Sequence, residues 1–215
     1  DTQKDIYYIS AETSAQALAS PHLEGFKSKN IPVLIMTDAI DQFWLPMIGS
    51  FKEKKFTSIT QGKINLDELD SKNKDKKNKS NDDKDKQDKE YVDLIAQLKV
   101  VLGDQVKDIR LSSKLTDSPV CLVADEGDMD IAMEQLMAQR DSNYKGAPRI
   151  LEINGDHSLI KNMKSLLSKK ESNDLVSDAG TLLFEQARLM EGKMPADPAQ
   201  FSKIMNQFLL KAIPN

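Results

Sequence analysis

The chain has 215 residues, of which 39% are hydrophobic and 30% are charged, and its formal net charge is −4. This length suits one large domain or two small ones. The longest apolar runs, such as residues 33–36, fall far short of the ~20 residues that cross a bilayer, which excludes a membrane span. The single cysteine, Cys121, excludes an internal disulfide and fits a reducing compartment, so we expect a cytoplasmic protein.

Residues 1–66 are predicted to form a small α/β unit. A β-rich run at residues 6–9 predicts a strand. Ser10 is placed to cap a helix that continues to about residue 19. Ser20 and Pro21 then suit the start of a further helical turn. Residues 31–36 are apolar at nearly every position, which is typical of a parallel strand covered on both faces.

The same unit continues with a helix predicted from residue 39 to about Gly49, with Thr37 and Asp38 as its cap, and with a loop and short strand over residues 51–59. A highly charged tract follows. Residues 71–89 contain eight Lys, five Asp and no apolar residue, so nothing offsets the entropy of ordering them. We interpret residues 67–90 as a charged flexible linker or the start of the next helix. Interspersed Asp and the lack of aromatic residues argue against nucleic-acid binding there.

Residues 91–215 are predicted to form a second, mixed α/β unit. Apolar residues spaced by three and four between Tyr91 and Leu102 predict a helix that Gly103 ends. Strands are predicted over residues 106–111, 120–124 and 149–153. Helices are predicted over residues 128–139, 157–168 with Asp156 as its cap, 174–191, and from Asp197-Pro198 to the C-terminus.

The last two predicted helices carry more apolar residues than one core-facing stripe needs. Phe184, Leu189, Leu210 and Ile213 lie outside the main stripes. The simplest explanation is a helical hairpin that pairs with its own copy across a two-fold axis and forms an intermolecular four-helix bundle. The alternative is that this chain's own sheet covers both faces.

The residues give no sign of an enzyme, a cofactor site or a metal site. The nine glycines are too far apart to form a phosphate-binding loop. Two histidines and one cysteine leave little material for zinc. Cys121 lies in an apolar run, which favours a buried structural thiol over a nucleophile. Adjacent Asp156, His157 and Ser158 suit a helix start better than a triad, because neighbouring side chains diverge.

Two apolar segments are candidates for recognition surfaces. The first is residues 41–48, in which Pro46 disturbs a predicted helix and Trp44 is either exposed or part of the core. The second is a stripe of Met129, Met133, Leu136 and Met137. Methionine-rich surfaces suit varied partners. The alternative for this stripe is that it packs on the chain's own sheet.

Several motifs resemble the ninety-kilodalton heat-shock (Hsp90) chaperone family, and most closely its bacterial high-temperature protein G branch. They are DIYYIS from Asp5, SPHLE from Ser20, PVLIMTDAID from Pro32, LGDQVKDIRL from Leu102, KLTDSPV from Lys114 and DPAQFSKIMNQ from Asp197. The resemblance implies a fragment: residues 1–66 as the C-terminal part of a middle domain and residues 91–215 as a C-terminal dimerisation domain. ATP and Mg²⁺ binding, and ATPase activity, would belong to the missing N-terminal part of the parent protein.

The resemblance also implies two kinds of functional residues and a homodimer whose partners are non-native client proteins. The client-binding residues would be Gln42, Phe43, Trp44, Pro46, Met129, Met133, Leu136 and Met137. The dimer interface would contain Leu182, Leu183, Met190, Phe201, Ile204, Met205, Phe208 and Leu209. Two other functions remain open: a dimeric scaffold without a client-binding role, and a thiol enzyme that uses Cys121.

Overall fold

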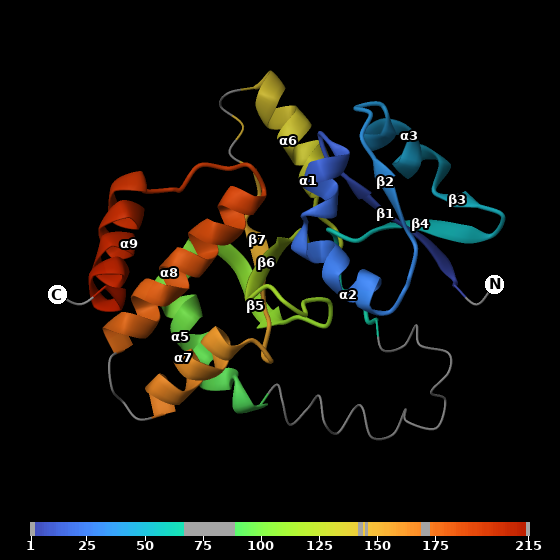
Figure 1. Ribbon diagram of the computed structural model, residues 1–215. Coiled ribbons are helices and arrows are strands. Elements are labelled where there is room, and N and C mark those ends of the chain that lie inside the picture. The colour runs from blue at the N-terminus through green and yellow to red at the C-terminus, as the bar shows by residue number, and fades with distance from the viewer. Residues whose placement is uncertain (1–2, 67–88, 142–143, 145, 169–172, 214–215) are drawn as a thin grey trace, which may run out of the picture.

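The computed structural model describes residues 3–66, 89–141, 144, 146–168 and 173–213, and shows an α+β protein built on two small sheets (Figure 1). One sheet lies before residue 67 and the other after residue 88. The α+β class predicted from the sequence is therefore confirmed. Nearly all of the predicted charged linker lies outside the described residues, so its flexibility stays a prediction.

The first sheet has four strands in the order β2-β1-β4-β3. They are β1 (Asp5–Ser10), β2 (Val33–Met36), β3 (Ser50–Phe51) and β4 (Lys54–Ser58). Strand β1 runs parallel to β2 and β4, and β3 pairs antiparallel with β4. The connection from β1 to β2 contains α1 (Ser14–Leu18), the 3-10 turn η1 (Pro21–Leu23) and α2 (Glu24–Ser28). The predicted β-α-β unit is present.

The core of this unit lies between β1 and the α1–α2 connection. Tyr7 and Ile9 alternate along β1 and are buried in one cluster with Leu23 and Phe26. The rings of Tyr7 and Phe26 lie 5.0 Å apart. Ser20 accepts a hydrogen bond from the His22 backbone N–H, as expected of the predicted cap.

Strand β2 differs from its prediction because it lies at the edge of the sheet. Leu34, in the middle of β2, is 45% exposed. The apolar run at residues 31–36 was therefore misread as a strand covered on both faces. A run of apolar residues predicts a strand, but it does not show whether the strand lies at the edge or in the centre of the sheet, or which elements cover its two faces.

Two predicted helix caps in this first unit are also wrong. The first helix begins after Thr13, whose hydroxyl accepts a hydrogen bond from the Gln16 N–H, and not after Ser10, which belongs to β1. Helix α3 (Asp41–Ile48) has no side-chain cap, and Thr37 and Asp38 lie in the loop before it. It includes Pro46 and ends at Gly49, which has a φ of 66°.

The second sheet has three strands in the order β5-β7-β6. Strand β7 (Arg149–Ile153) is central, runs parallel to β5 (Val106–Leu111) and antiparallel to β6 (Val120–Val123). All five residues of β7 are buried. Helices α5 (Val92–Leu102), α7 (Ser158–Ser168) and α8 (Asn173–Met190) share one core with this sheet. These elements match the prediction. The predicted cap of α7 is wrong, however, because His157 Nδ1 and not Asp156 accepts the Leu159 N–H at the start of this helix.

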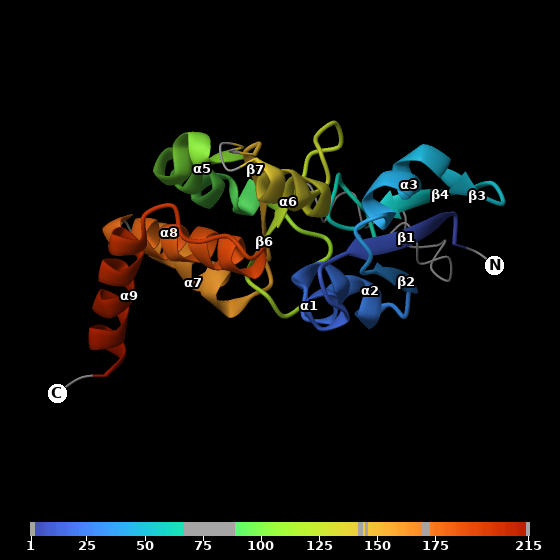
Figure 2. The same cartoon turned by 90° about the horizontal axis from the view of Figure 1, so that it is seen from above.

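The C-terminal helix α9 (Pro198–Ala212) packs against α8 and projects away from the rest of the chain (Figure 2). Asp197 caps α9 by accepting hydrogen bonds from the Ala199 and Gln200 N–H groups, as predicted. Helix α6 (Ile131–Arg140) lies between the two sheets (Figure 1), and Gln135 of α6 lines a common cavity with Gln16 of α1. The predicted hairpin of the last two helices, α8 and α9, is present. The pairing of this hairpin with a second copy stays a prediction.

A continuous set of backbone and side-chain contacts joins the two units. Residues 60–62 run parallel to the end of β6: the Ala124 N–H donates to the Thr60 carbonyl at 2.9 Å, and the Gly62 N–H donates to the Ala124 carbonyl at 2.8 Å. On the other side, the Glu24 carboxylate accepts the backbone N–H groups of residues 116–118. These contacts join both ends of β6 to the first unit.

Candidate functional site

The first candidate surface is the α3 patch, which we define as Gln42, Phe43, Trp44 and Pro46. Pro46 is exposed and the other three side chains are half-buried. The Trp44 indole N–H donates to Asp41 at 2.7 Å, and its ring meets Phe56 edge-on with 6.0 Å between centroids. Trp44 is thus held in place without entering the core. Met47, which follows Trp44 by three positions in α3, is 86% exposed.

The second candidate surface is the α6 patch, which we define as Met129, Met133, Leu136 and Met137. Met129 is exposed and the other three are half-buried. The residues of α6 that are fully buried are instead Ile131 and Glu134. Half-buried side chains are compatible both with a recognition surface and with the alternative that the stripe packs on the chain's own sheet, so the client-binding role of these residues stays a prediction.

The start of α6 is anchored on the first unit. Asp130 caps the helix by accepting the Ala132 N–H at 3.0 Å. Its second carboxylate oxygen accepts the hydroxyl of Ser58 at 2.5 Å and that of Thr60 at 2.8 Å. The segment that leaves β4 therefore positions the helix that carries the α6 patch.

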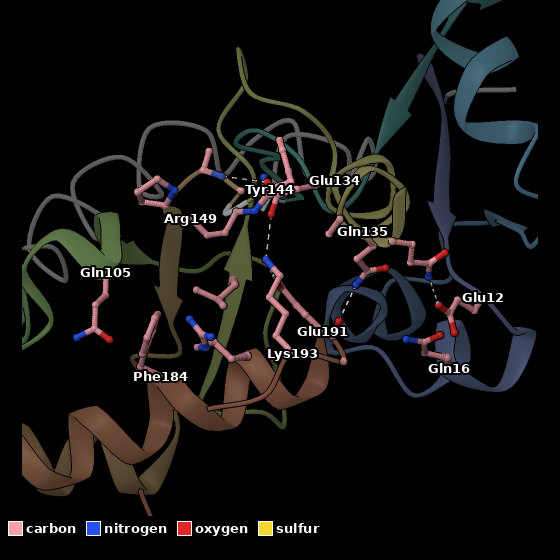
Figure 3. Close-up of a pocket in the computed structure, with 18 residues that line it drawn as sticks. Glu12, Gln16, Gln105, Glu134, Gln135, Tyr144, Arg149, Phe184, Glu191 and Lys193 are labelled. Carbon is pink, nitrogen blue, oxygen red and sulfur yellow. Dashed lines mark hydrogen bonds and ion pairs between the residues drawn. The ribbon is translucent and has the colours of Figure 1, made fainter. Parts of the chain in front are cut away.

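A buried ion pair anchors the middle of α6. Glu134 accepts a hydrogen bond from Arg149 in β7 at 2.5 Å and from Lys193 at 3.0 Å (Figure 3). Arg149 also donates to the Met129 carbonyl at 2.9 Å. No local sequence pattern predicts this network, because its partners lie 15 and 59 positions from Glu134.

Glu191 lies beside this network with only 7% of its side chain exposed. Burial raises its pKa to about 7, because the positive charges of Lys193 and Arg149 offset only part of the cost of burying a carboxylate. Gln135 in α6 donates to the Glu191 carbonyl at 2.6 Å (Figure 3). A group that titrates near neutrality thus lies against the helix of the α6 patch.

The two patches meet at one groove. A groove of about 320 Å³ lies between α6 and the loops that follow β1 and β2, and Gln42 of the α3 patch and Leu136 of the α6 patch both line it. On its other side, α6 borders a cavity of about 590 Å³ (Figure 3). Glu12, Gln135 and Gln139 line both spaces. The structure therefore brings together candidate residues that are more than 90 positions apart in the chain.

The predicted dimer residues fall into three groups by exposure. Leu183 and Ile204 are buried within the chain. Leu182, Phe201 and Phe208 are half-buried, and Phe208 packs on the second core. Met190, Met205 and Leu209 are exposed, as are Leu210 and Ile213. The exposed group leaves an apolar surface on α8 and α9 that the described part of the chain does not cover.

Cys121 does not form a nucleophilic site. It is buried in β6, and burial, with the nearby Glu152 charge, raises the pKa of its thiol well above the usual range. A protonated buried thiol is a poor nucleophile. Among the described residues, no three His, Cys, Asp or Glu side chains are grouped to hold a metal ion, and no helix there is long and apolar enough to cross a membrane.

Comparison with known proteins gives the chain a family. Residues 1–214 match the family described as Hsp90 protein. The chain is 40% identical over 213 residues to chaperone protein HtpG of Roseobacter denitrificans, covering 98% of this chain and 34% of that protein. It is 38% identical over 213 residues to the HtpG of Paramagnetospirillum magneticum, covering 99% and 34%, and 36% identical over 203 residues to that of Streptomyces coelicolor, covering 94% and 31%.

The chain thus spans about one third of the length of these relatives. The matches run through both units and through the residues of both patches. The resemblance that the sequence motifs indicated is confirmed, and the chain belongs to the Hsp90 chaperone family.

Proposed function

We propose that this chain is the client-holding and dimerising part of an Hsp90-type molecular chaperone, with residues 1–66 from the middle domain and residues 91–215 as the dimerisation domain. The observation that carries the proposal is the groove lined by both Gln42 and Leu136. One segment of a non-native protein lying in it would touch the α3 patch and the α6 patch together.

The chemistry of the patches suits clients of varied sequence. Methionine side chains are flexible and polarisable, so they adapt to partners of different shape. Met129 and Met47 are exposed, while Trp44 is held by Asp41 as a rigid aromatic platform. Each patch is small, so binding at one copy would be weak and reversible, as holding requires.

Dimerisation would increase this weak binding. The exposed apolar residues Met190, Met205 and Leu209 would pair with a second copy in a four-helix bundle. Two grooves on one client would then act through effective concentration, which strengthens binding without any new contact.

ATP and Mg²⁺ would act in other parts of the parent protein, whose cytoplasmic location stays part of the proposal. The residues of the 590 Å³ cavity do not fit a triphosphate. Three carboxylates line it, including Glu191, and its three cations are already engaged: Arg149 and Lys193 by Glu134, and Arg188 by Glu185. A scaffold without clients is less well supported. A scaffold would have both apolar patches buried, whereas Pro46 of the α3 patch and Met129 of the α6 patch are exposed.

The proposal is tested by binding of a permanently unfolded, reduced and alkylated protein to two variants. We expect Trp44→Ala with Met133→Ser to weaken binding at least about fivefold, which is about 1 kcal/mol, without changing the dimer. Met47→Ser with Met129→Ser is a second variant with little risk to the fold, because it removes an exposed apolar side chain of α3 next to the α3 patch and an exposed one of the α6 patch. Val92→Ser with Val100→Ser removes exposed apolar groups from α5 and serves as the control. Normal binding by both patch variants would refute the site.

A further inference from the structure

We infer that the groove between α6 and the loops after β1 and β2 selects client segments in which basic side chains flank an apolar one. This inference rests on the proposed function, and it names the chemistry of the client that the site takes. It is carried by the charges, hydrogen bonds and apolar residues that line the groove.

Two carboxylates stand at one end of the first sheet. Ser10 and Met36 are paired at the ends of the parallel strands β1 and β2. Glu12 and Asp38 each follow two residues later, so both leave the same edge of the sheet, and both line the groove. Their side chains are exposed, so a ligand in the groove can reach them.

No cation of the described residues neutralises these carboxylates. The lining of the groove contains no Lys, Arg or His among the residues that the structure describes. Glu12 accepts a hydrogen bond from the neutral amide of Gln139 at 3.0 Å. Neither Glu12 nor Asp38 forms an ion pair within the described parts of the chain. A bound segment with Lys or Arg would supply the missing charge, and an acidic segment would be repelled.

The rest of the groove suits an apolar side chain and the backbone beside it. Leu136 lines it as part of the α6 patch. The amide groups of Gln42, Gln135 and Gln139 also line it, and such groups can both donate to and accept from a peptide backbone. A volume of about 320 Å³ is at the lower end of ligand-sized pockets, which fits a short segment rather than a folded surface.

The test uses three short peptides that share one apolar sequence and carry flanking Lys, Gln or Glu residues. Their affinities for the dimeric chain are measured by fluorescence anisotropy at low and high salt. We expect the Lys peptide to bind about three- to tenfold more tightly than the Gln peptide, since exposed ion pairs contribute modestly, and the Glu peptide to bind least. High salt should reduce this preference.

Two charge variants locate the effect. Glu12→Gln with Asp38→Asn should abolish the preference, so that the Lys and Gln peptides bind this variant with the same affinity. Asp104→Asn with Asp174→Asn removes the same charge from exposed positions that do not line the groove, and should keep the preference.

Failure of the inference and failure of the proposed function are distinguishable. If the three peptides bind alike and all weaken in the Trp44→Ala, Met133→Ser variant, clients bind the two patches but the groove does not select basic segments. If the Lys preference survives Glu12→Gln with Asp38→Asn, the inference is also overturned. If Glu12→Gln with Asp38→Asn changes the solution mass of the protein, a second copy of the chain and not a client occupies the groove. If neither the peptides nor the unfolded protein respond to any patch variant, the proposed function itself fails.

Discussion

The carboxylate of Glu134 in α6 lies 2.5 Å from the guanidinium of Arg149 in β7, and both side chains are only 3% exposed. Helix α6 is therefore attached to the second sheet by a buried ion pair, and its buried residues are Ile131 and Glu134 rather than its methionines. This attachment leaves Met133, Leu136 and Met137 half-buried at the surface. A polar anchor of this kind holds the helix without burying its methionines completely, as the proposed client-binding role requires.

Removal of Glu134 should destabilise the chain strongly. Glu134→Ala would leave Arg149 buried without its counter-charge, which typically costs about 3–5 kcal/mol. The free energy of unfolding is measured by urea titration, followed by Trp44 fluorescence and by circular dichroism. Replacing both partners, as Glu134→Leu with Arg149→Met, should recover most of the loss, because no fully buried charge is left unpaired. Lys193, which also pairs with Glu134, is 32% exposed and keeps Glu191 at 3.5 Å. A loss below about 1 kcal/mol in Glu134→Ala would mean that the pair does not anchor α6.

Glu191 should make stability depend on pH. Its pKa rises from an ordinary 4.5 to about 7 in the folded chain, so the folded state holds a proton that the unfolded state releases between these values. Stability therefore falls as pH rises from about 4.5 to 7 and is level above that range. Glu191→Gln removes this loss and should stabilise the chain at pH 8, by on the order of 2–3 kcal/mol relative to its effect at pH 4. Equal effects at both pH values would contradict the raised pKa.

Glu24 should stabilise the junction between the two units above its pKa. Burial raises the pKa of this carboxyl, but hydrogen bonds from Ser118, Asp117 and Thr116 outweigh burial and hold the pKa below its usual value. The stabilisation is thus present at neutral pH and is lost as pH falls through the lowered pKa. Glu24→Gln should cost about 1–2 kcal/mol at pH 7 and progressively less as pH falls through the lowered pKa of Glu24.

Hydrogen exchange of residues 116–118 is the matched readout for Glu24→Gln. Their amides donate to the Glu24 carboxylate, so protection should fall there first. Unchanged protection at neutral pH would show that Glu24 does not hold this loop.

Leu209 tests the proposed dimer. It is 49% exposed in the single chain, so Leu209→Asp should leave the fold intact and place a charge in the proposed bundle. Light scattering should give a mass near twice 24.1 kDa for the unsubstituted chain and near 24.1 kDa for the Leu209→Asp variant. Val100→Asp, at an exposed position on α5, is the control and should stay dimeric. A parent chain that is monomeric on dilution would remove the bundle.

Local signals predicted much of the fold. The glycines that end α5 and α8, Gly103 and Gly192, adopt positive φ as expected of helix ends. Asp197-Pro198 begins α9, and the buried run at residues 149–153 is the central strand β7. Each of these depends on residues within a few positions, which is why the sequence alone was sufficient.

Long-range relationships could not be predicted in the same way. The edge position of β2 depends on the strand order, which no local pattern specifies. The Glu134–Arg149 pair and the groove shared by Gln42 and Leu136 depend on how the two units pack. The family resemblance indicated the residues of the two patches, and the structure shows that Gln42 and Leu136 line one groove.

The most direct test of the shared groove is photo-crosslinking of a short apolar client peptide that carries one photoreactive residue, mapped by mass spectrometry. If one bound segment touches both patches, labelled fragments should come from residues 37–48 and from residues 129–140, and excess unfolded protein should compete both away together. Labelling of only one patch, or mainly of α9, would contradict a common client-binding groove.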